Sequence, residues 1–315
     1  MRERDGDAVL LPLVLVMVLW AGNITIVKWA VDDWEPLAFS FLRFGVAALV
    51  FAGFVLAREG TLRIARRDVP LLLAASLFGI FLNQLCFMYA TVYAEAGVIA
   101  LLMATAPAWA ALAVFALRLE RVGSRHWLGL GVAGVGVVLV IAGSGATLAF
   151  TSIRGDLLAL GMGATWAWYS LLVRPLMRRY SAARISALIL LVGTPMLLPF
   201  AWPQLGRQDY GALDAGHWSA LVYSCLLALV LTNFIWFHAV HRAGAARTTA
   251  DMPLQPVYGA VMAFLLLGER LAPLEWIGGL VAIAGVVITQ RAAMGDAYRP
   301  SAPISRATSR WKRTA

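Results

Sequence analysis

Two stretches far apart in the chain decide the fold: LERVGSRHWLGLGVAGVG at residues 119–136 and GERLAPLEWIGGLVAIAG at residues 268–285. Each has a Glu-Arg pair, a Trp seven residues after the Glu, and then an apolar run with small residues at matching positions. The two stretches are related by a constant offset of 149 residues. Because a chance match would not hold one offset through so many residue types, these stretches indicate an internal repeat.

The repeat extends well beyond these two stretches. The further matching positions are Pro107 with Pro256, and, at an offset of 146, Trp20-Ala21 with Trp166-Ala167 and Lys28 with Arg174. The sequence therefore predicts two related units at residues 9–142 and 156–290, followed by a basic tail at residues 292–315.

The composition excludes a water-soluble globular protein. Of 315 residues, 61% are hydrophobic and 14% are charged, against roughly 45–50% and about 25% in soluble proteins. Continuous apolar runs without alternation favour membrane helices over an outer-membrane barrel. Ten such runs are expected to span the membrane: Val9–Val31, Pro36–Ala57, Val69–Ala90, Ala94–Leu117, His126–Ala142, Asp156–Val173, Ile185–Trp202, Trp218–Val240, Ala245–Leu267 and Leu274–Gln290.

The basic residues predict how these spans are oriented. Of 26 Lys and Arg, 21 fall on the side of the amino terminus, whereas Lys28, Arg154, Arg207 and Arg270 fall on the other side. By the positive-inside rule, both termini are cytoplasmic and the protein is a multi-pass protein of the inner cell membrane. This asymmetry accounts for the net charge of +9 without a nucleic-acid partner. Because each unit holds five spans, the second unit enters the membrane from the opposite side, as an inverted-topology repeat.

The same residues carry a family resemblance. The two Trp-Ala pairs, the paired prolines, the turns at residues 119–121 and 268–270 and the glycine-rich runs at 129–136 and 278–285 resemble the EamA family of the drug/metabolite transporter superfamily. The likeness runs from Leu10 to about Gln290. It implies a ten-helix secondary transporter, usually an exporter of amino acids and related metabolites, with aromatic amino-acid exporters most similar in character. No cofactor and no metal are expected, and the expected partners are a small-molecule substrate and the lipid bilayer, with the protein a monomer or weak homodimer.

Polar side chains in mid-span are candidate substrate-binding residues, because such groups are costly at membrane depth. Tryptophans deep in the spans are candidates as well, because Trp20 and Trp166 are repeat mates on helices that, by the family resemblance, would face a central cavity. Amides can bind the amino and carboxylate groups of an amino acid, and aromatic rings can stack on an aromatic or cationic guest. The alternative is that the amides bond neighbouring helices and the rings fill helix packing. The candidates are Trp20, Asn23, Asn83, Trp109, Trp166, Trp168, Tyr169, Asn233, Trp236 and Gln255.

Proline and charged residues within the spans suggest further roles. Pro107 and Pro256 are expected to kink their helices at equivalent points and to serve as gating hinges. Lys28 and Arg43 are expected to reach the outer membrane surface and to pair with nearby acids. A local ion pair with Arg247 accounts for Asp251, although proton coupling through Asp251 or Glu95 stays open.

Two other functions compete with amino-acid export. An exporter of lipophilic cationic drugs would need a buried carboxylate at the centre of the cavity, and Asp251 lies too close to the membrane edge. A membrane enzyme would have to bring His238, His241 and Asp251 together, and none of these has a charged or histidine mate in the repeat. The favoured hypothesis is therefore a transporter, not an enzyme, that works by alternating access of its two repeats. No phosphate-binding Gly-x-x-x-x-Gly-Lys-Ser/Thr loop is present, so ion or substrate gradients would drive it.

Overall fold

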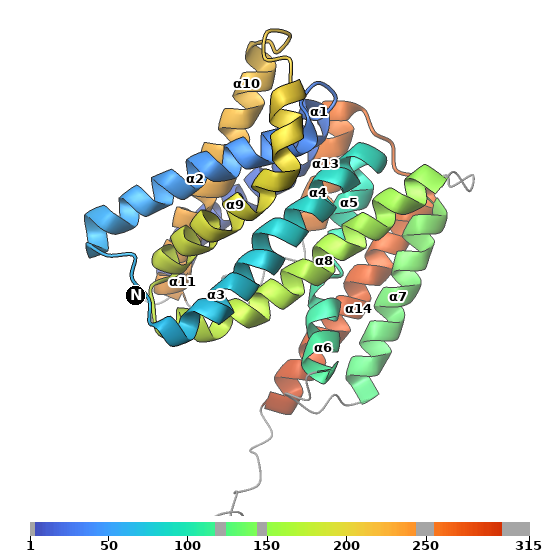
Figure 1. Ribbon diagram of the computed structural model, residues 1–315. Helices are drawn as coiled ribbons and strands as arrows, with labels where there is room; N and C mark the ends of the chain where they lie inside the picture. The colour runs from blue at the N-terminus through green and yellow to red at the C-terminus, as the bar shows by residue number, and fades with distance from the viewer. Residues whose placement is uncertain (1–3, 117–123, 144–149, 244–254, 298–315) are drawn as a thin grey trace, which may run out of the picture.

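The computed structural model describes residues 4–116, 124–143, 150–243 and 255–297, and the regular structure within these ranges is entirely helical (Figure 1). The first half contains α1 (Arg4–Ala30), α2 (Pro36–Glu59), η1 (Arg66–Asp68), α3 (Val69–Ser76), η2 (Leu77–Leu82), α4 (Asn83–Tyr93), α5 (Ala96–Met103), α6 (Ala106–Ala116) and α7 (Ser124–Gly143). The second half contains α8 (Phe150–Met177), α9 (Ala182–Arg207), α10 (Ala215–Val222), η3 (Tyr223–Leu231), α11 (Thr232–Ala243), α13 (Gln255–Leu267) and α14 (Pro273–Ala297).

Several of these helices are built to cross a bilayer, because an apolar helix satisfies its own backbone hydrogen bonds there. Within the described ranges, seven helical stretches are long and apolar enough: Pro12–Ala30, Pro36–Glu59, Arg66–Tyr93, Ala96–Ala113, Ile153–Met177, Ala182–Arg207 and Ala215–Trp236. Three shorter apolar helices cover Trp127–Gly143, Gln255–Leu267 and Pro273–Thr289. The molecule is thus a multi-pass membrane protein.

The expected fourth and ninth spans differ from continuous helices with a proline in the middle. Helix α5 ends at Met103, and α6 begins at Ala106, one residue before Pro107. Pro256 is the second residue of α13, and residues 245–254 lie outside the described ranges. A proline in the first turn of a helix costs little, because the N–H it lacks would have no partner there. Pro107 therefore follows a break between two helices instead of kinking one.

Helices α7 and α14 run side by side and touch through their backbones (Figure 1). A Cβ built on Gly136 would lie 2.2 Å from the backbone N of Ala282, and one on Gly285 would lie 2.2 Å from the backbone N of Ala133. Small residues allow such close approach in membrane proteins. The two contacts are equivalent in the repeat, since the 149-residue offset matches Ala133 with Ala282 and Gly136 with Gly285.

Two stretches of π-helix interrupt the long membrane helices, and the sequence did not predict them. Segment η2 lies between α3 and α4, and η3 lies between α10 and α11. Their first residues, Leu77 and Tyr223, are separated by the same 146 residues that relate Trp20 to Trp166. The two halves therefore share this irregularity at equivalent places.

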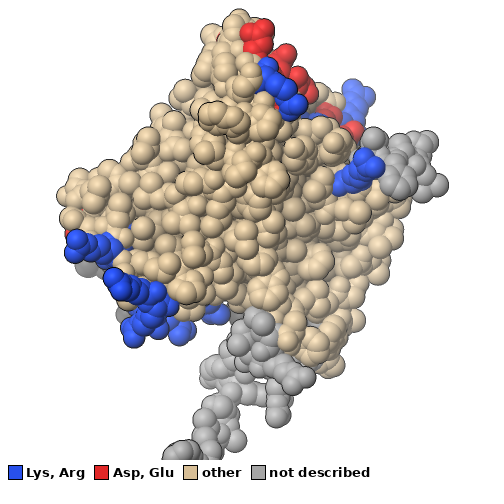
Figure 2. Space-filling model, in the orientation of Figure 1, with Lys and Arg blue, Asp and Glu red and all other residues tan. Residues whose placement is uncertain are grey.

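Charged side chains gather at opposite ends of the bundle, with an apolar belt between them (Figure 2). On the face shown, basic residues gather over the ends of α2 and α3, which we call the basic end, whereas acidic and basic residues lie together at the top, beyond the apolar belt. At the basic end, Glu59 pairs with Arg184 at 2.5 Å, and Tyr180 donates to Asp68 at 2.8 Å. At the other end, His217 Nε2 lies 2.9 Å from an Asp33 carboxylate oxygen.

Candidate functional site

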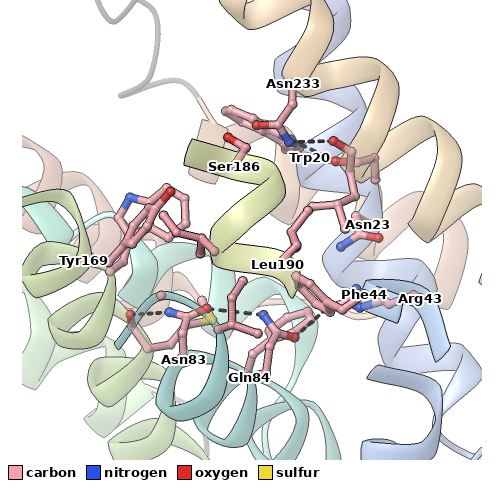
Figure 3. Close-up of a pocket in the computed structure, with 18 of the residues that line it drawn as sticks. Trp20, Asn23, Arg43, Phe44, Asn83, Gln84, Tyr169, Ser186, Leu190 and Asn233 are labelled. Atoms are coloured by element: carbon pink, nitrogen blue, oxygen red, sulfur yellow. Dashed lines mark hydrogen bonds between the residues drawn. The ribbon is translucent and has the colours of Figure 1, made fainter. Parts of the chain in front are cut away.

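The helices enclose a cavity of about 510 Å³ (Figure 3), within the range of pockets that bind small molecules. Its lining comes from both halves of the chain, chiefly from α1, α2, η2, α4, α8, α9, η3 and α11. Eight predicted residues line it: Trp20, Asn23, Asn83, Trp166, Tyr169, Asn233, Trp236 and Gln255.

The other two predicted residues, Trp109 and Trp168, do not line this cavity. Trp168 stacks on Phe78 with ring centroids 5.8 Å apart. The Trp109 ring packs toward Gly163 of α8, where an added Cβ would lie 3.4 Å from it. These two indoles contribute to helix packing.

Both π-helical segments border the cavity, and η2 makes room there for an aromatic side chain. Gly79 of η2 lines the cavity, and a Cβ on it would lie 2.4 Å from the ring of Tyr169. Ser224 and Ala228 of η3 line the cavity as well. Because π-turns often occur at functional sites, their paired presence singles out this region. A glycine within the apolar run at 77–82 was the available sequence signal.

Trp20 and Trp236 form an aromatic wall of the cavity, and the indole N–H of Trp20 is already hydrogen-bonded within the protein. The Trp20 Nε1–H donates to the carbonyl of Ala228 at 3.0 Å and to the Thr232 hydroxyl at 2.9 Å. The ring of Trp20 lies 5.5 Å from that of Trp236. Since the indole N–H is occupied, this part of the wall can contact an apolar or aromatic guest through its rings.

The three candidate asparagines differ in how their amides are used. Asn83 Nδ2 donates to the Met162 carbonyl at 3.0 Å and to the Thr165 hydroxyl at 3.1 Å, so it joins α4 to α8. Asn233 Nδ2 donates to the Leu229 carbonyl of its own helical turn. Asn23 Oδ1, in contrast, is buried and accepts no hydrogen bond from the described residues. Asn23 thus has a buried acceptor that is available to a ligand.

Arg43 corrects the prediction that it reaches the outer membrane surface. Its side chain is only 4% exposed, and it lines the cavity. The guanidinium donates to Ser224 Oγ at 2.7 Å and to Gln84 Oε1 at 2.6 Å. The acids expected near it have other partners, because Asp33 contacts His217 and Glu35 lies 3.8 Å from Arg207. The sequence did not indicate Arg43 as a site residue, because an ion pair with one of those acids, which are close to it in sequence, was a sufficient explanation of its charge.

The remaining charged candidates lie away from the cavity or outside the described ranges. Lys28 Nζ donates to the Thr91 carbonyl at 2.9 Å. Glu95 is the N-cap residue of α5; partial desolvation of its carboxyl, followed by the charge of Glu269, raises the pKa of that group. Asp251 and Arg247 lie outside the described ranges, as does the tail at 298–315.

The histidines of the enzyme hypothesis form no described site. His238 is exposed on α11, and the side chain of His241 lies outside the described part of the chain. Among the described residues, no group of three His, Cys, Asp or Glu side chains could hold a metal ion.

The cavity reaches one end of the bundle, and packed contacts occupy the other. Met177 and Ser186, at the adjoining ends of α8 and α9, line it near the basic end. At the opposite end, the backbone N–H of Leu37 donates to Gln204 Oε1 at 2.6 Å. There the Glu269 carboxylate also accepts hydrogen bonds of 3.1 and 3.0 Å from the first two amides of α5. We call this second end the closed end.

Apolar helices around an internal cavity of small-molecule size define a polytopic membrane protein with a central cavity, which we call the chamber. The model of the EamA-like transporter family matches residues 8–142 and 153–291. The chain belongs to the EamA-like transporter family, which confirms the resemblance carried by the repeat motifs.

Two relatives named as probable exporters or efflux pumps match this chain over nearly their whole length. A probable terminal-alkyne amino-acid exporter of Streptantibioticus cattleyicolor is 28% identical over 92% of this chain and 96% of its own. A probable amino-acid metabolite efflux pump of Salmonella typhimurium is 27% identical over 97% of this chain and its whole length. A solved crystal structure with 18% identity superposes with a TM-score of 0.62 over 92% of this chain and 99% of its own, and so shares the fold.

Proposed function

We propose that the protein is a secondary transporter that exports small amphipathic metabolites, amino acids first and aromatic ones in particular. The observation that carries this proposal is the chamber itself, which combines aromatic faces at Trp20 and Trp166 with the buried polar groups of Asn23 and Arg43. A guest with an apolar side chain and a charged head group matches both kinds of surface. The relatives named as amino-acid exporters support the same substrate class.

The proposed architecture is ten membrane helices in two inverted repeats that alternate in access around the chamber. Three observations support it. The family model matches the chain twice, once in each half. Gly136 of α7 meets Ala282 of α14, and the repeat-matched residue Gly285 of α14 meets the repeat-matched residue Ala133 of α7. Such reciprocal contacts are those expected across a two-fold axis. The π-segments η2 and η3 also fall at equivalent positions.

We place the protein in the inner cell membrane, with the basic end and both termini on the cytoplasmic side. The chamber then reaches the cytoplasmic side, where an exporter takes up its substrate, and the closed end faces outward. In this orientation α7 and α14 form a scaffold between the halves. The unit of function proposed is the monomer or a weak homodimer, without nucleic acid or cofactor.

Export of cationic drugs is the less favoured alternative. Among the described residues, no carboxylate lines the chamber, and the charged lining side chain is the cation Arg43. A buried cation opposes the entry of another cation, because like charges repel strongly where the dielectric constant is low.

Counterflow of labelled amino acids into proteoliposomes tests the proposal. We expect aromatic amino acids to exchange faster than aliphatic ones, and Asn23→Ala and Trp166→Ala to slow this exchange. Trp202→Ala is the matched control, because Trp202 is 70% exposed and does not line the chamber. If the wild type exchanges no amino acid, the substrate class is wrong. If both chamber variants exchange normally, the binding-site assignment is wrong.

A further inference from the structure

Arg43 is a buried cation without a counterion in the described part of the chain. Its side chain is 4% exposed, and no described carboxylate lies within the 4.0 Å of an ion pair. A guanidinium has five N–H donors, of which neighbouring side chains accept only two here, and its Nε is buried with no partner. Burying a charge is strongly unfavourable unless a partner compensates it.

Arg43 also lies too deep to reach the membrane surface. It follows the first residue of α2 by seven positions, or roughly 10 Å at 1.5 Å per residue. Three phenylalanine rings surround the guanidinium carbon at 4.8, 5.4 and 5.8 Å from their centroids. These apolar walls exclude water and leave the chamber as the direction from which a compensating group can come.

A hydrogen-bond network holds the guanidinium in place before any ligand binds. Gln84 Oε1 accepts from Arg43 at 2.6 Å and from the Ser40 hydroxyl at 3.1 Å, while Gln84 Nε2 lies 3.4 Å from Asn83 Oδ1. Asn83 is in turn bonded to α8 (Figure 3). The second donor bond reaches Ser224 on η3. The network thus joins α2, α4, α8 and η3, which orders the group at no further cost on binding.

Building on the proposed function, we propose that Arg43 binds the carboxylate of the transported substrate. A carboxylate has the charge, the planar shape and the two acceptor oxygens that suit the remaining guanidinium donors. The substrate class is then an organic acid with an apolar or aromatic side chain, and neither an amine nor an amide meets this requirement.

Asn23 supplies a second contact for a substrate that is an amino acid. Its buried Oδ1 has no partner among the described residues and can accept a hydrogen bond from an ammonium group. Figure 3 shows Asn23 and Arg43 on one side of the cavity, with Tyr169 across from them. The carboxylate and the ammonium group would then bind on one side of the cavity, and the side chain of the substrate would extend toward Tyr169.

A purely structural role for Arg43 makes different predictions. If the guanidinium only tied helices together, its removal would lower the melting temperature and leave ligand selectivity unchanged. If it binds the substrate, its removal strongly weakens the response to carboxylates, whatever its effect on the stability of the ligand-free protein.

The test compares three probes on the purified full-length protein: L-phenylalanine, L-phenylalaninol, which lacks the carboxylate, and 3-phenylpropionate, which lacks the amine. Counterflow in proteoliposomes and the shift in melting temperature are measured for the wild type, Arg43→Gln and Arg43→Met. The matched control is Arg63→Gln, because Arg63 is exposed on the segment between α2 and η1. The comparison of probes on the wild type remains decisive even if a variant does not fold.

We expect Arg43→Gln to raise the phenylalanine concentration needed for half-maximal counterflow roughly 10–100-fold, because losing a hydrogen bond to a charged group usually has an effect of this size. Phenylalaninol is expected to be similarly weak on the wild type, and Arg63→Gln to behave as the wild type. The proposal is overturned if phenylalaninol competes as well as phenylalanine, or if both Arg43 variants retain phenylalanine affinity. If the wild type moves no amino acid but 3-phenylpropionate stabilises it through Arg43, the proposed function fails and this inference stands. If 3-phenylpropionate has no effect either, both fail.

Discussion

The contact between α7 and α14 gives the most quantitative prediction. Gly136→Ala adds a Cβ at 2.2 Å from the backbone N of Ala282 and 2.6 Å from the carbonyl oxygen of Gly278. Ordinary van der Waals contact begins near 3.4 Å. Because the neighbouring atoms belong to the backbone and cannot rotate away as a side chain could, the two helices must separate by about 1 Å. Overpacking of this kind costs typically 1–3 kcal/mol. Gly285→Ala, which meets the backbone N of Ala133 at 2.2 Å, should cost a similar amount.

Gly134→Ala is the matched control on the same helix, since nothing lies within 4 Å of its added Cβ. Alanine is favoured over glycine within a helix by about 1 kcal/mol, so this variant should be as stable as the wild type or slightly more so. Unfolding in detergent, followed by tryptophan fluorescence, measures the three variants side by side. Equal stability of Gly136→Ala and Gly134→Ala would refute the backbone contact between α7 and α14.

Three further predictions concern the closed end and the chamber. Glu269→Ala leaves the first two amides of α5 without their acceptor and should lower stability by about 1 kcal/mol, as loss of a helix cap does; thermal melting checks this. The pKa of Asp214 is lowered, chiefly by the hydrogen bond from the backbone N–H of His217. The charged carboxylate therefore stabilises the fold at pH values above the ordinary pKa of aspartate, and this stabilisation is lost as the pH falls through the lowered pKa of Asp214. Asp214→Asn should therefore be less stable than the wild type at neutral pH and equal to it in acid, and a difference independent of pH would contradict this. Gly79→Val should displace the ring of Tyr169 and reduce counterflow, and unchanged transport would show that this ring does not shape the chamber.

The sequence predicted the apolar spans, and eight of the ten candidate residues it singled out line the chamber. Polar side chains are costly within apolar runs unless something pairs with them, and Asn23 stood out on that ground. Trp20 and Trp166 stood out because they lie deep in their spans at matching positions of the repeat. Trp109 and Trp168 also lie deep in their spans yet serve packing. Depth along a helix can be read from sequence, but the direction of a side chain around the helix depends on its neighbours.

Arg43 shows why the rest of the site could not be predicted. Three acids lie close to it in sequence, which made a surface ion pair the simplest interpretation. In the fold, Asp33 and Glu35 contact residues of the second half instead, and those partners are more than 150 residues away. The π-segments were likewise invisible, because composition does not distinguish a π-turn from an α-turn in an apolar run.

The central claim is that the closed end must open for substrate to cross, and a reversible cross-link tests it most directly. A Cβ on Gly97 would lie 3.2 Å from Leu271 Cγ, close enough for a disulfide between cysteines at these two positions. The experiment measures phenylalanine counterflow by Gly97→Cys/Leu271→Cys, with Cys86 and Cys225 replaced by alanine, before and after reduction. The account predicts that the oxidised protein does not exchange phenylalanine and that reduction restores exchange. Equal exchange by the fully cross-linked and the reduced protein would contradict it.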